Sequence, residues 1–158
     1  MVRLEVDYYH VTRGKTAVTP GDVLLPGYWG RTMRAIPHQV PEGYDPAWIS
    51  LLWEVAFEAA RPPDFPSRLE SLFAFRDEAE ARWFRTNVRK GVGELCRVRL
   101  VDPSAKIHLG HYDMIGMHQS KGFIEYVPYC AHAYWHEAPR GKVEVLIEGP
   151  LRVEEIIS

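Results

Sequence analysis

Glycine and proline divide this chain into short segments. The 158 residues include 12 glycines and 12 prolines, and both residue types interrupt helices and strands. The segments between them show no internal repeat, low-complexity tract or flexible linker. This pattern predicts a single domain over residues 1–158 that is built from many short elements.

Several segments alternate apolar and polar side chains, as a strand with one buried face does. The predicted strands are residues 2–8, 71–75, 95–101, 142–148 and 151–157, with a further candidate at 122–127. In the first strand Val6 and Tyr8 belong to the apolar set, and His10 stands two residues further on, at the next position of the same face. We therefore expect His10 to face the core or a cleft.

Two segments have the apolar spacing of a helix. The first covers residues 46–60 after Asp45, and the second covers residues 78–89 after Asp77. Asp77 and Glu80 are spaced as a capping box. The second helix is expected to bury three apolar residues: Trp83, Phe84 and Val88. Many short strands with two helices and no regular strand–helix alternation predict an α+β fold with antiparallel sheets.

The charge balance limits the possible partners. Nineteen Lys and Arg oppose 21 Asp and Glu, so the net charge is −2. Broad electrostatic binding of long nucleic acids needs a basic excess and is not expected. No apolar run reaches about 18 residues, and the first residues lack the apolar stretch of a signal peptide. The cytoplasm is the expected compartment, although an exported toxin domain has the same composition.

Common phosphate-binding and nucleophile motifs are absent, including the P-loop, Gly-x-Gly-x-x-Gly and Gly-x-Ser-x-Gly. Five of the seven histidines fall between residues 108 and 136. His132 and His136 are spaced to share one helix face, with Cys130 nearby, which leaves a zinc site and a metal-dependent hydrolase as one hypothesis. The alternative is that these histidines serve hydrogen bonding among neighbouring aromatic residues.

The sequence Tyr-Tyr-His-Val-Thr-Arg at residues 8–13 is followed by a Pro-Gly-Asp turn at 20–22. This segment resembles the opening of the rifampin ADP-ribosyltransferases, where a strand ending in Tyr-His-Gly-Thr precedes a Pro-Gly-Asp turn. A strand ending in His-Gly-Thr or His-Gly-Ser is also the first motif of the diphtheria-toxin-like and poly(ADP-ribose) polymerase-like enzymes. Val11 departs from this motif, because it stands where glycine is usual.

Two later segments are similar to the remaining motifs of these enzymes. Residues 71–75 resemble a strand that carries a tyrosine or serine and leads into a short helix, and Phe73 stands at the tyrosine of the polymerase-like members. Residues 143–153 resemble the last motif, in which a glutamate opens the strand before the closing one. Glu144 matches the second acid of the Glu-x-Glu-Val-Leu pattern, whereas Lys142 stands at the first.

Two further likenesses accompany these motifs. The rifampin branch places its acid after the strand that matches residues 99–103, so Asp113 is a second candidate acid. Residues 66–69 and the predicted helix at 46–60 resemble a bacterial family of unassigned function that we place near the same superfamily.

The resemblance implies an α+β domain in which two packed antiparallel β-sheets form a cleft with a few flanking helices. It implies that NAD is the substrate and that Glu144 stabilises the positive charge that develops on ribose. The residues expected to bind NAD are His10, Val11 and Thr12 from the first motif, Ser71 and Phe73 from the second, and Arg31 and Arg34 near the pyrophosphate. The ordinary alternatives are a solvated Glu144, solvated arginines, and core roles for His10 and Phe73.

The function predicted from this resemblance is transfer of ADP-ribose from NAD to a protein, a nucleic-acid base or a small molecule, with release of nicotinamide. Two alternatives keep the fold. One is an NAD glycohydrolase with water as acceptor, and the other is a non-catalytic NAD-binding or nucleotide-binding module. The departures at Val11 and Phe73 keep the binding module in consideration.

Overall fold

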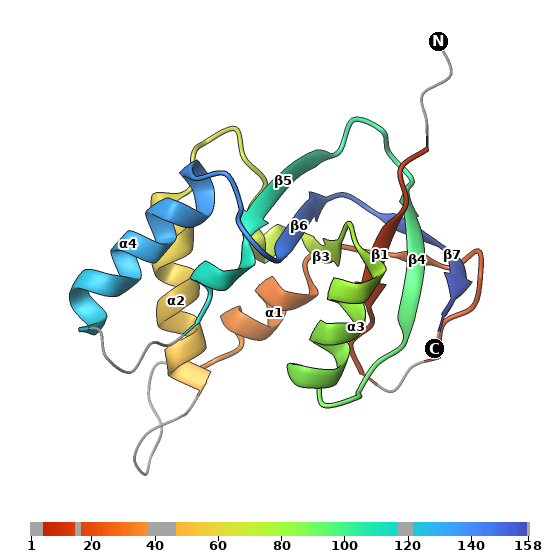
Figure 1. The fold of residues 1–158 in the computed structure, drawn as a ribbon, viewed down its shortest axis with the longest axis horizontal. Coiled ribbons are helices and arrows are strands. Elements are labelled where there is room, and N and C mark those ends of the chain that lie inside the picture. The colour runs from red at the N-terminus through yellow and green to blue at the C-terminus, as the bar shows by residue number, and fades with distance from the viewer. Residues whose placement is uncertain (1–4, 15–16, 38–46, 117–121, 158) are drawn as a thin grey trace.

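A computed structural model of the protein describes residues 5–14, 17–37, 47–116 and 122–157. Its elements follow one another along the chain as shown in Figure 1. They are β1 (Tyr8–Val11), β2 (Val23–Leu24), α1 (Tyr28–Arg34), α2 (Ala47–Ala60), η1 (Arg68–Glu70), β3 (Leu72–Phe75), α3 (Glu78–Asn87), β4 (Leu95–Leu100), β5 (Lys106–His111), η2 (Tyr112–Met114), α4 (Phe123–His136), β6 (Val143–Glu148) and β7 (Leu151–Ile156).

The described strands form one seven-stranded antiparallel sheet in the order β2-β7-β4-β1-β3-β6-β5. The α+β prediction is confirmed, but the prediction of two separate sheets is not. A single register pair, Tyr9 with Phe75, joins β1 to β3. The other central ladders are longer: β1 makes four register pairs with β4, and β3 makes four with β6. The sheet is therefore continuous and has a narrow seam at its centre.

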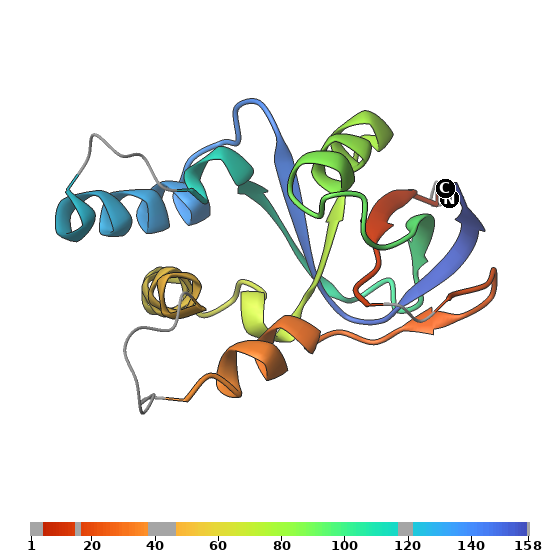
Figure 2. The same cartoon turned by 90° about the horizontal axis from the view of Figure 1, so that it is seen from below.

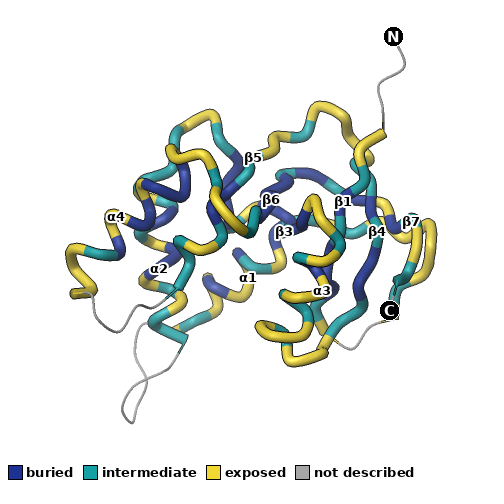
Figure 3. Tube along the Cα trace, in the orientation of Figure 1, coloured by how far each residue is buried: buried dark blue, intermediate teal, exposed yellow. Residues whose placement is uncertain are grey.

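The helices cover different parts of this sheet (Figure 2). Helices α2 and α4 pack against each other, and α4 also contacts β5, whereas α3 packs against β1 and β3. Leu146 on β6 joins the apolar core between α2 and α4, while Val145 and Ile147 face the core inside the curved sheet. Figure 3 shows the resulting concentration of buried residues in the central strands. None of the described helices combines the length and apolar character that a bilayer span requires.

Both predicted helices are present, and the cap of α3 is confirmed. Asp77 accepts hydrogen bonds from the backbone N–H groups of Ala79 and Glu80, at 2.7 and 3.2 Å. The Glu80 carboxylate instead accepts from the backbone N–H of Val143 at 3.3 Å. This contact ties α3 to the start of β6. The predicted cap of α2 at Asp45 lies outside the described residues.

Some expectations are corrected by the structure. Residues 122–127 begin helix α4 instead of forming a strand, because Val127, Ala131 and Tyr134 share one buried helical face. Trp83 and Val88 were expected to be buried, but they are 37% and 44% exposed. On α3 itself the buried residue is Ala81. The sequence pattern also predicted neither α1, β5 and the two-residue strand β2 nor the short helices η1 and η2. The first strand was predicted at residues 2–8, but β1 is Tyr8–Val11: Val6 before it is 55% exposed, Tyr8 and His10 are buried, and residues 2–4 lie outside the described residues.

Candidate functional site

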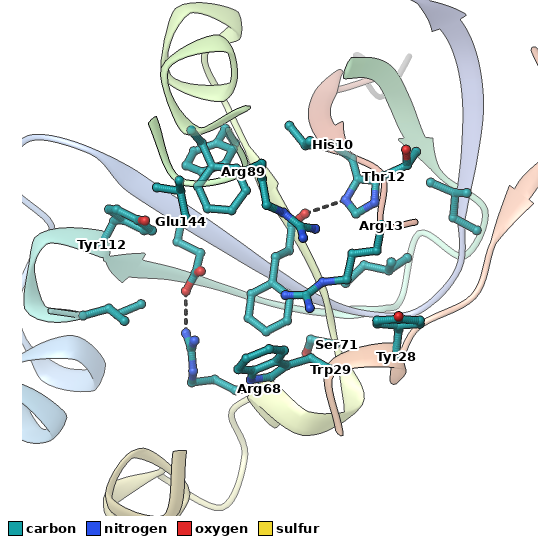
Figure 4. A pocket seen from close by; sticks show the side chains of 18 of the residues that line it. His10, Thr12, Arg13, Tyr28, Trp29, Arg68, Ser71, Arg89, Tyr112 and Glu144 are labelled. Atoms are coloured by element: carbon teal, nitrogen blue, oxygen red, sulfur yellow. Dashed lines mark hydrogen bonds and ion pairs between the residues drawn. The ribbon is translucent and has the colours of Figure 1, made fainter. Parts of the chain in front are cut away.

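A pocket of about 540 Å³ opens where the seam separates β1 from β3 (Figure 4). Its walls come from the end of β1, from β3, from the start of α1 and from the residues that follow α3. Tyr112 and Glu144 contribute from the β5–β6 side. The volume is typical of a site for a small molecule or cofactor.

Six of the nine predicted site residues line this pocket: His10, Val11, Thr12, Ser71, Phe73 and Glu144. They come from three segments that are far apart in the sequence. The spatial convergence required by the three motifs is therefore present.

The other three predicted residues lie outside this pocket. Arg31 and Arg34 are on the exposed face of α1, whose first residues, Tyr28 and Trp29, line the pocket instead. Arg34 forms an exposed ion pair with Glu70. Asp113 lies in η2 with about half of its side chain exposed, and its nearest cation is Lys142 Nζ at 3.9 Å.

Glu144 is buried and held by two donors. Its Oε2 accepts hydrogen bonds from Arg68 Nη1 at 2.5 Å and from the Tyr134 hydroxyl at 2.6 Å. The guanidinium of Arg68 also binds Glu54 through Nε and Nη2, at 2.9 and 3.0 Å. All four side chains are buried, so this network fixes the position of the Glu144 carboxylate.

The protonation states in this network follow from its charges. Burial alone would lower the pKa of Arg68, but the charge of Glu144, together with Tyr134 and Glu54, holds that pKa well above its ordinary value. Burial and the charge of Glu144 raise the pKa of Tyr134 well above its usual range, so its hydroxyl remains a donor. Within the described chain, Glu144 Oε1 makes no hydrogen bond, and it is the oxygen left for a ligand.

His10 is a neutral group inside the same pocket. Its Nδ1 lies 2.6 Å from the carbonyl oxygen of Phe73, which can only accept, so Nδ1 carries the proton. Burial lowers the pKa of His10 to about 4 against the effect of the Phe73 carbonyl, and the charges of Arg89 and Arg13 lower it further. At neutral pH its Nε2 is therefore a hydrogen-bond acceptor.

Three predicted ligand contacts already have partners within the protein. The Ser71 hydroxyl donates to the carbonyl oxygen of Ser67 at 2.6 Å. The Thr12 hydroxyl accepts from the backbone N–H of Glu94 at 2.9 Å. The Arg68 guanidinium lies 5.0 Å from the centre of the Phe73 ring. These side chains shape the pocket walls and hold them together.

Sequence reasoning missed three arginines that line the pocket: Arg13, Arg68 and Arg89. Arg13 had a signal, because it directly follows the His-Val-Thr segment of the first motif. Arg68 lies in the 66–69 segment that resembles a bacterial family, but that likeness assigned it no role, and no motif contained Arg89; the fold brings both to the seam.

The late histidines do not assemble with Cys130. The rings of His132 and His136 stack 4.4 Å apart on the exposed face of α4, whereas Cys130 is buried on the opposite face. In the part of the chain that the structure describes, no three His, Cys, Asp or Glu residues are grouped to hold a metal ion. His118 lies outside the described residues.

A family model described as "Protein of unknown function (DUF2441)" matches residues 38–158. The chain belongs to this family. The DUF2441 match includes β3, Arg68, Arg89 and Glu144, whereas β1 with His10 and Arg13 precedes it. No curated protein matches the chain.

Proposed function

We propose that the protein is an ADP-ribosyltransferase that binds NAD in the seam pocket and transfers ADP-ribose to an acceptor. One observation carries the proposal: the Glu144 carboxylate, with Oε1 available, and the neutral His10 line one pocket at the seam. These residues belong to the first and last of the three segments that resemble ADP-ribosyltransferase motifs. On this proposal the sheet is an ADP-ribosyltransferase-like sheet with two wings, β2-β7-β4-β1 and β3-β6-β5, which remain joined at the seam between β1 and β3.

The chemistry needs a fixed negative charge beside the reacting ribose. The bond from ribose C1′ to the nicotinamide nitrogen breaks, and its electron pair leaves with nicotinamide as a neutral ring. Positive charge then develops on C1′ and the ring oxygen, as in glycoside cleavage. Glu144 Oε1 accepts a hydrogen bond from a ribose hydroxyl and stabilises that charge. The acceptor forms the new bond to C1′ and loses a proton.

The surrounding network prepares Glu144 for this role. Glu54 neutralises part of the charge of Arg68, so the Glu54–Arg68–Glu144 group keeps a net charge of −1. Because Arg68 and Tyr134 hold Oε2, the carboxylate does not need to reorganise when the cationic transition state forms. His10 Nε2 accepts a hydrogen bond from a hydroxyl of the second ribose.

The proposal is tested by measuring nicotinamide release from NAD with purified protein. Glu144→Gln is the informative variant, because its carbonyl oxygen can still accept from Arg68 and Tyr134 while its NH₂ group replaces Oε1. We expect nicotinamide release to fall by roughly a hundredfold or more, in line with the loss of one electrostatic stabiliser. Asp113→Asn is the matched control and is expected to retain release.

The other outcomes separate the alternatives. NAD that raises the unfolding temperature without being cleaved identifies a binding module. Cleavage without label transfer to any fraction of a lysate, when radiolabelled NAD is supplied, identifies a glycohydrolase. Release that survives in Glu144→Gln and disappears in Asp113→Asn would assign the acid to Asp113 and contradict the proposal.

A further inference from the structure

Two arginines of the pocket have no counter-ion in the described structure. Arg13 follows β1, and Arg89 follows the end of α3. Arg68, the third, forms ion pairs with both Glu54 and Glu144, whereas neither Arg13 nor Arg89 forms an ion pair with a described carboxylate. The pocket therefore contains two arginines without an ion-pair partner, beside the Glu54–Arg68–Glu144 group with its net charge of −1.

The two side chains are partly withdrawn from water. Burial and the charge of Arg89 lower the pKa of Arg13 to about 10, and burial also lowers the pKa of Arg89. The Nε of Arg89 is buried and has no hydrogen-bond partner among the described residues. A buried donor without a partner is costly, and a ligand that accepts from it removes this cost.

Aromatic rings hold both cations in place without neutralising them. The guanidinium carbon of Arg13 lies 4.5 Å from the centre of the Trp29 ring, and that of Arg89 lies 5.8 Å from the centre of the Phe84 ring. Trp29 Nε1 is a second buried donor with no partner in the described chain. Figure 4 shows the two arginines reaching into the pocket from different sides.

The charge, the free donors and the two directions of approach favour an anion with two charged groups. We propose that Arg13 and Arg89 form a binding site for an organic diphosphate, with each guanidinium contacting one phosphate group. Planar guanidinium groups match the oxygen atoms of phosphate. In the view of Figure 4 the two arginines lie between His10 and Glu144, which line the same pocket. Assigning the diphosphate to NAD rests on the proposed function, whereas the anion site itself does not.

The experiment measures binding by titration calorimetry for four probes: ADP-ribose, AMP, adenosine and inorganic pyrophosphate. We expect ADP-ribose to bind more tightly than AMP, and AMP more tightly than adenosine. Arg13→Gln and Arg89→Gln are each expected to weaken ADP-ribose binding roughly tenfold to a hundredfold, while leaving the weak binding of adenosine unchanged. Arg31→Gln removes an arginine of α1 outside the pocket and is expected to bind like the wild type.

Lysine variants separate loss of the anion site from loss of the fold. Arg13→Lys and Arg89→Lys keep the charge and are expected to bind ADP-ribose with intermediate affinity, because lysine lacks the two-pronged geometry of arginine. Thermal unfolding without ligand shows whether each variant is folded. Folded glutamine variants that bind ADP-ribose as tightly as the wild type would overturn the site, as would equal wild-type affinity for adenosine and ADP-ribose.

The pyrophosphate probe distinguishes this inference from the proposed function. If pyrophosphate binds with the same dependence on Arg13 and Arg89 but ADP-ribose binds no more tightly, the anion site is supported and the NAD assignment is contradicted. If ADP-ribose binds through both arginines and NAD is not cleaved, the diphosphate site is again supported, and the catalytic part of the proposal is contradicted.

Discussion

Burial in the pocket keeps the imidazole of His10 neutral. The ordinary pKa of histidine is 6.5, and the pKa of His10 in the folded protein is about 4, chiefly because burial disfavours the charged ring. Between these values the unfolded chain binds more protons than the folded chain. The free energy of unfolding therefore falls as the pH is lowered from 6.5 to about 4.

His10→Asn tests this assignment. The asparagine NH₂ group can replace Nδ1–H as donor to the Phe73 carbonyl, but the side chain does not titrate. We expect the loss of unfolding free energy between pH 6.5 and pH 4 to be smaller in the variant by about 3 kcal/mol. Urea titrations at several pH values measure it. Identical pH dependence in the two proteins would show that His10 titrates freely.

Arg68 is the residue whose removal should be most damaging to stability. It is buried, and it links Glu54 on α2 to Glu144 on β6. Arg68→Met leaves two buried carboxylates without their cation and is expected to lower the free energy of unfolding by about 3–5 kcal/mol. Arg152→Met is the control, because Arg152 pairs with Glu154 at the surface. It should cost less than about 1 kcal/mol.

The compensated variant checks the cause of this loss. Arg68→Met combined with Glu54→Gln and Glu144→Gln removes the unpaired charges together with the cation. Chemical denaturation should show that much of the stability lost in Arg68→Met is recovered. A triple variant no more stable than the single one would show that Arg68 acts through packing against Phe57, Phe73 and Tyr134.

At the scale of elements, the contact between β5 and α4 depends on a glycine. A Cβ atom added to Gly110 would lie 2.5 Å from the Tyr134 hydroxyl oxygen and 2.4 Å from its ring carbon Cζ. Gly110 also pairs with Glu144 in the β5–β6 ladder. Close approach of α4 to the sheet is therefore what brings the Tyr134 hydroxyl to the Glu144 carboxylate.

Gly110→Ala should consequently disturb the site by displacing Tyr134 from the Glu144 carboxylate. We expect it to lower the free energy of unfolding by about 1–3 kcal/mol through overpacking and to reduce NAD cleavage more than the stability loss explains. Gly116→Ala is the matched control, since its added Cβ has no atom of the described residues beyond its chain neighbours within 4 Å. Denaturation and nicotinamide release are measured on both variants. Unchanged cleavage in a folded Gly110→Ala protein would separate Tyr134 from the reaction.

Elements with a regular apolar pattern could be predicted, whereas those formed by tertiary contacts could not. The alternation at 142–148 predicts β6, and the spacing of Trp48, Leu51 and Val55 predicts α2. Strand β5 contains Lys106, His108 and Gly110, which are poor strand signals, and forms because β6 pairs along its whole length. Pro128 obscured α4, although prolines are tolerated where packing supplies the stability.

The candidate site follows the same division. His10 and Glu144 could be found because parity and motif likeness act on each strand separately. The counter-ions of Glu144 could not, since Arg68 is separated from it by 76 residues and from Glu54 by 14. Arg31 and Arg34 lie in a segment where the sequence pattern predicted no helix. The formation of α1 directs Tyr28 and Trp29 to the pocket and both arginines away from it.

For the whole molecule, the pocket lies where the two wings of the sheet meet, so a ligand bound there would contact both wings. One register pair, Tyr9–Phe75, one hydrogen bond from His10 to the Phe73 carbonyl, and apolar packing join β1 to β3. Arg13 belongs to the β1 side and Glu144 to the β6 side, while Arg89 follows α3, which packs against both β1 and β3. A ligand that contacts both Arg13 and Glu144 would connect both sides.

Hydrogen exchange with and without ADP-ribose tests this coupling. A ligand that binds the native state opposes every opening that breaks its site, by about 2.7 kcal/mol at a hundred times its dissociation constant. We therefore expect the amides of β1 and β3 to be protected together, including Tyr9 and Phe75. The exposed start of α4 contacts neither wing at the seam and should exchange at an unchanged rate. A ligand that bridges β1 and β3 requires both strands to open and close as one unit. Protection confined to one of the two strands would therefore mean that the ligand does not cross the seam.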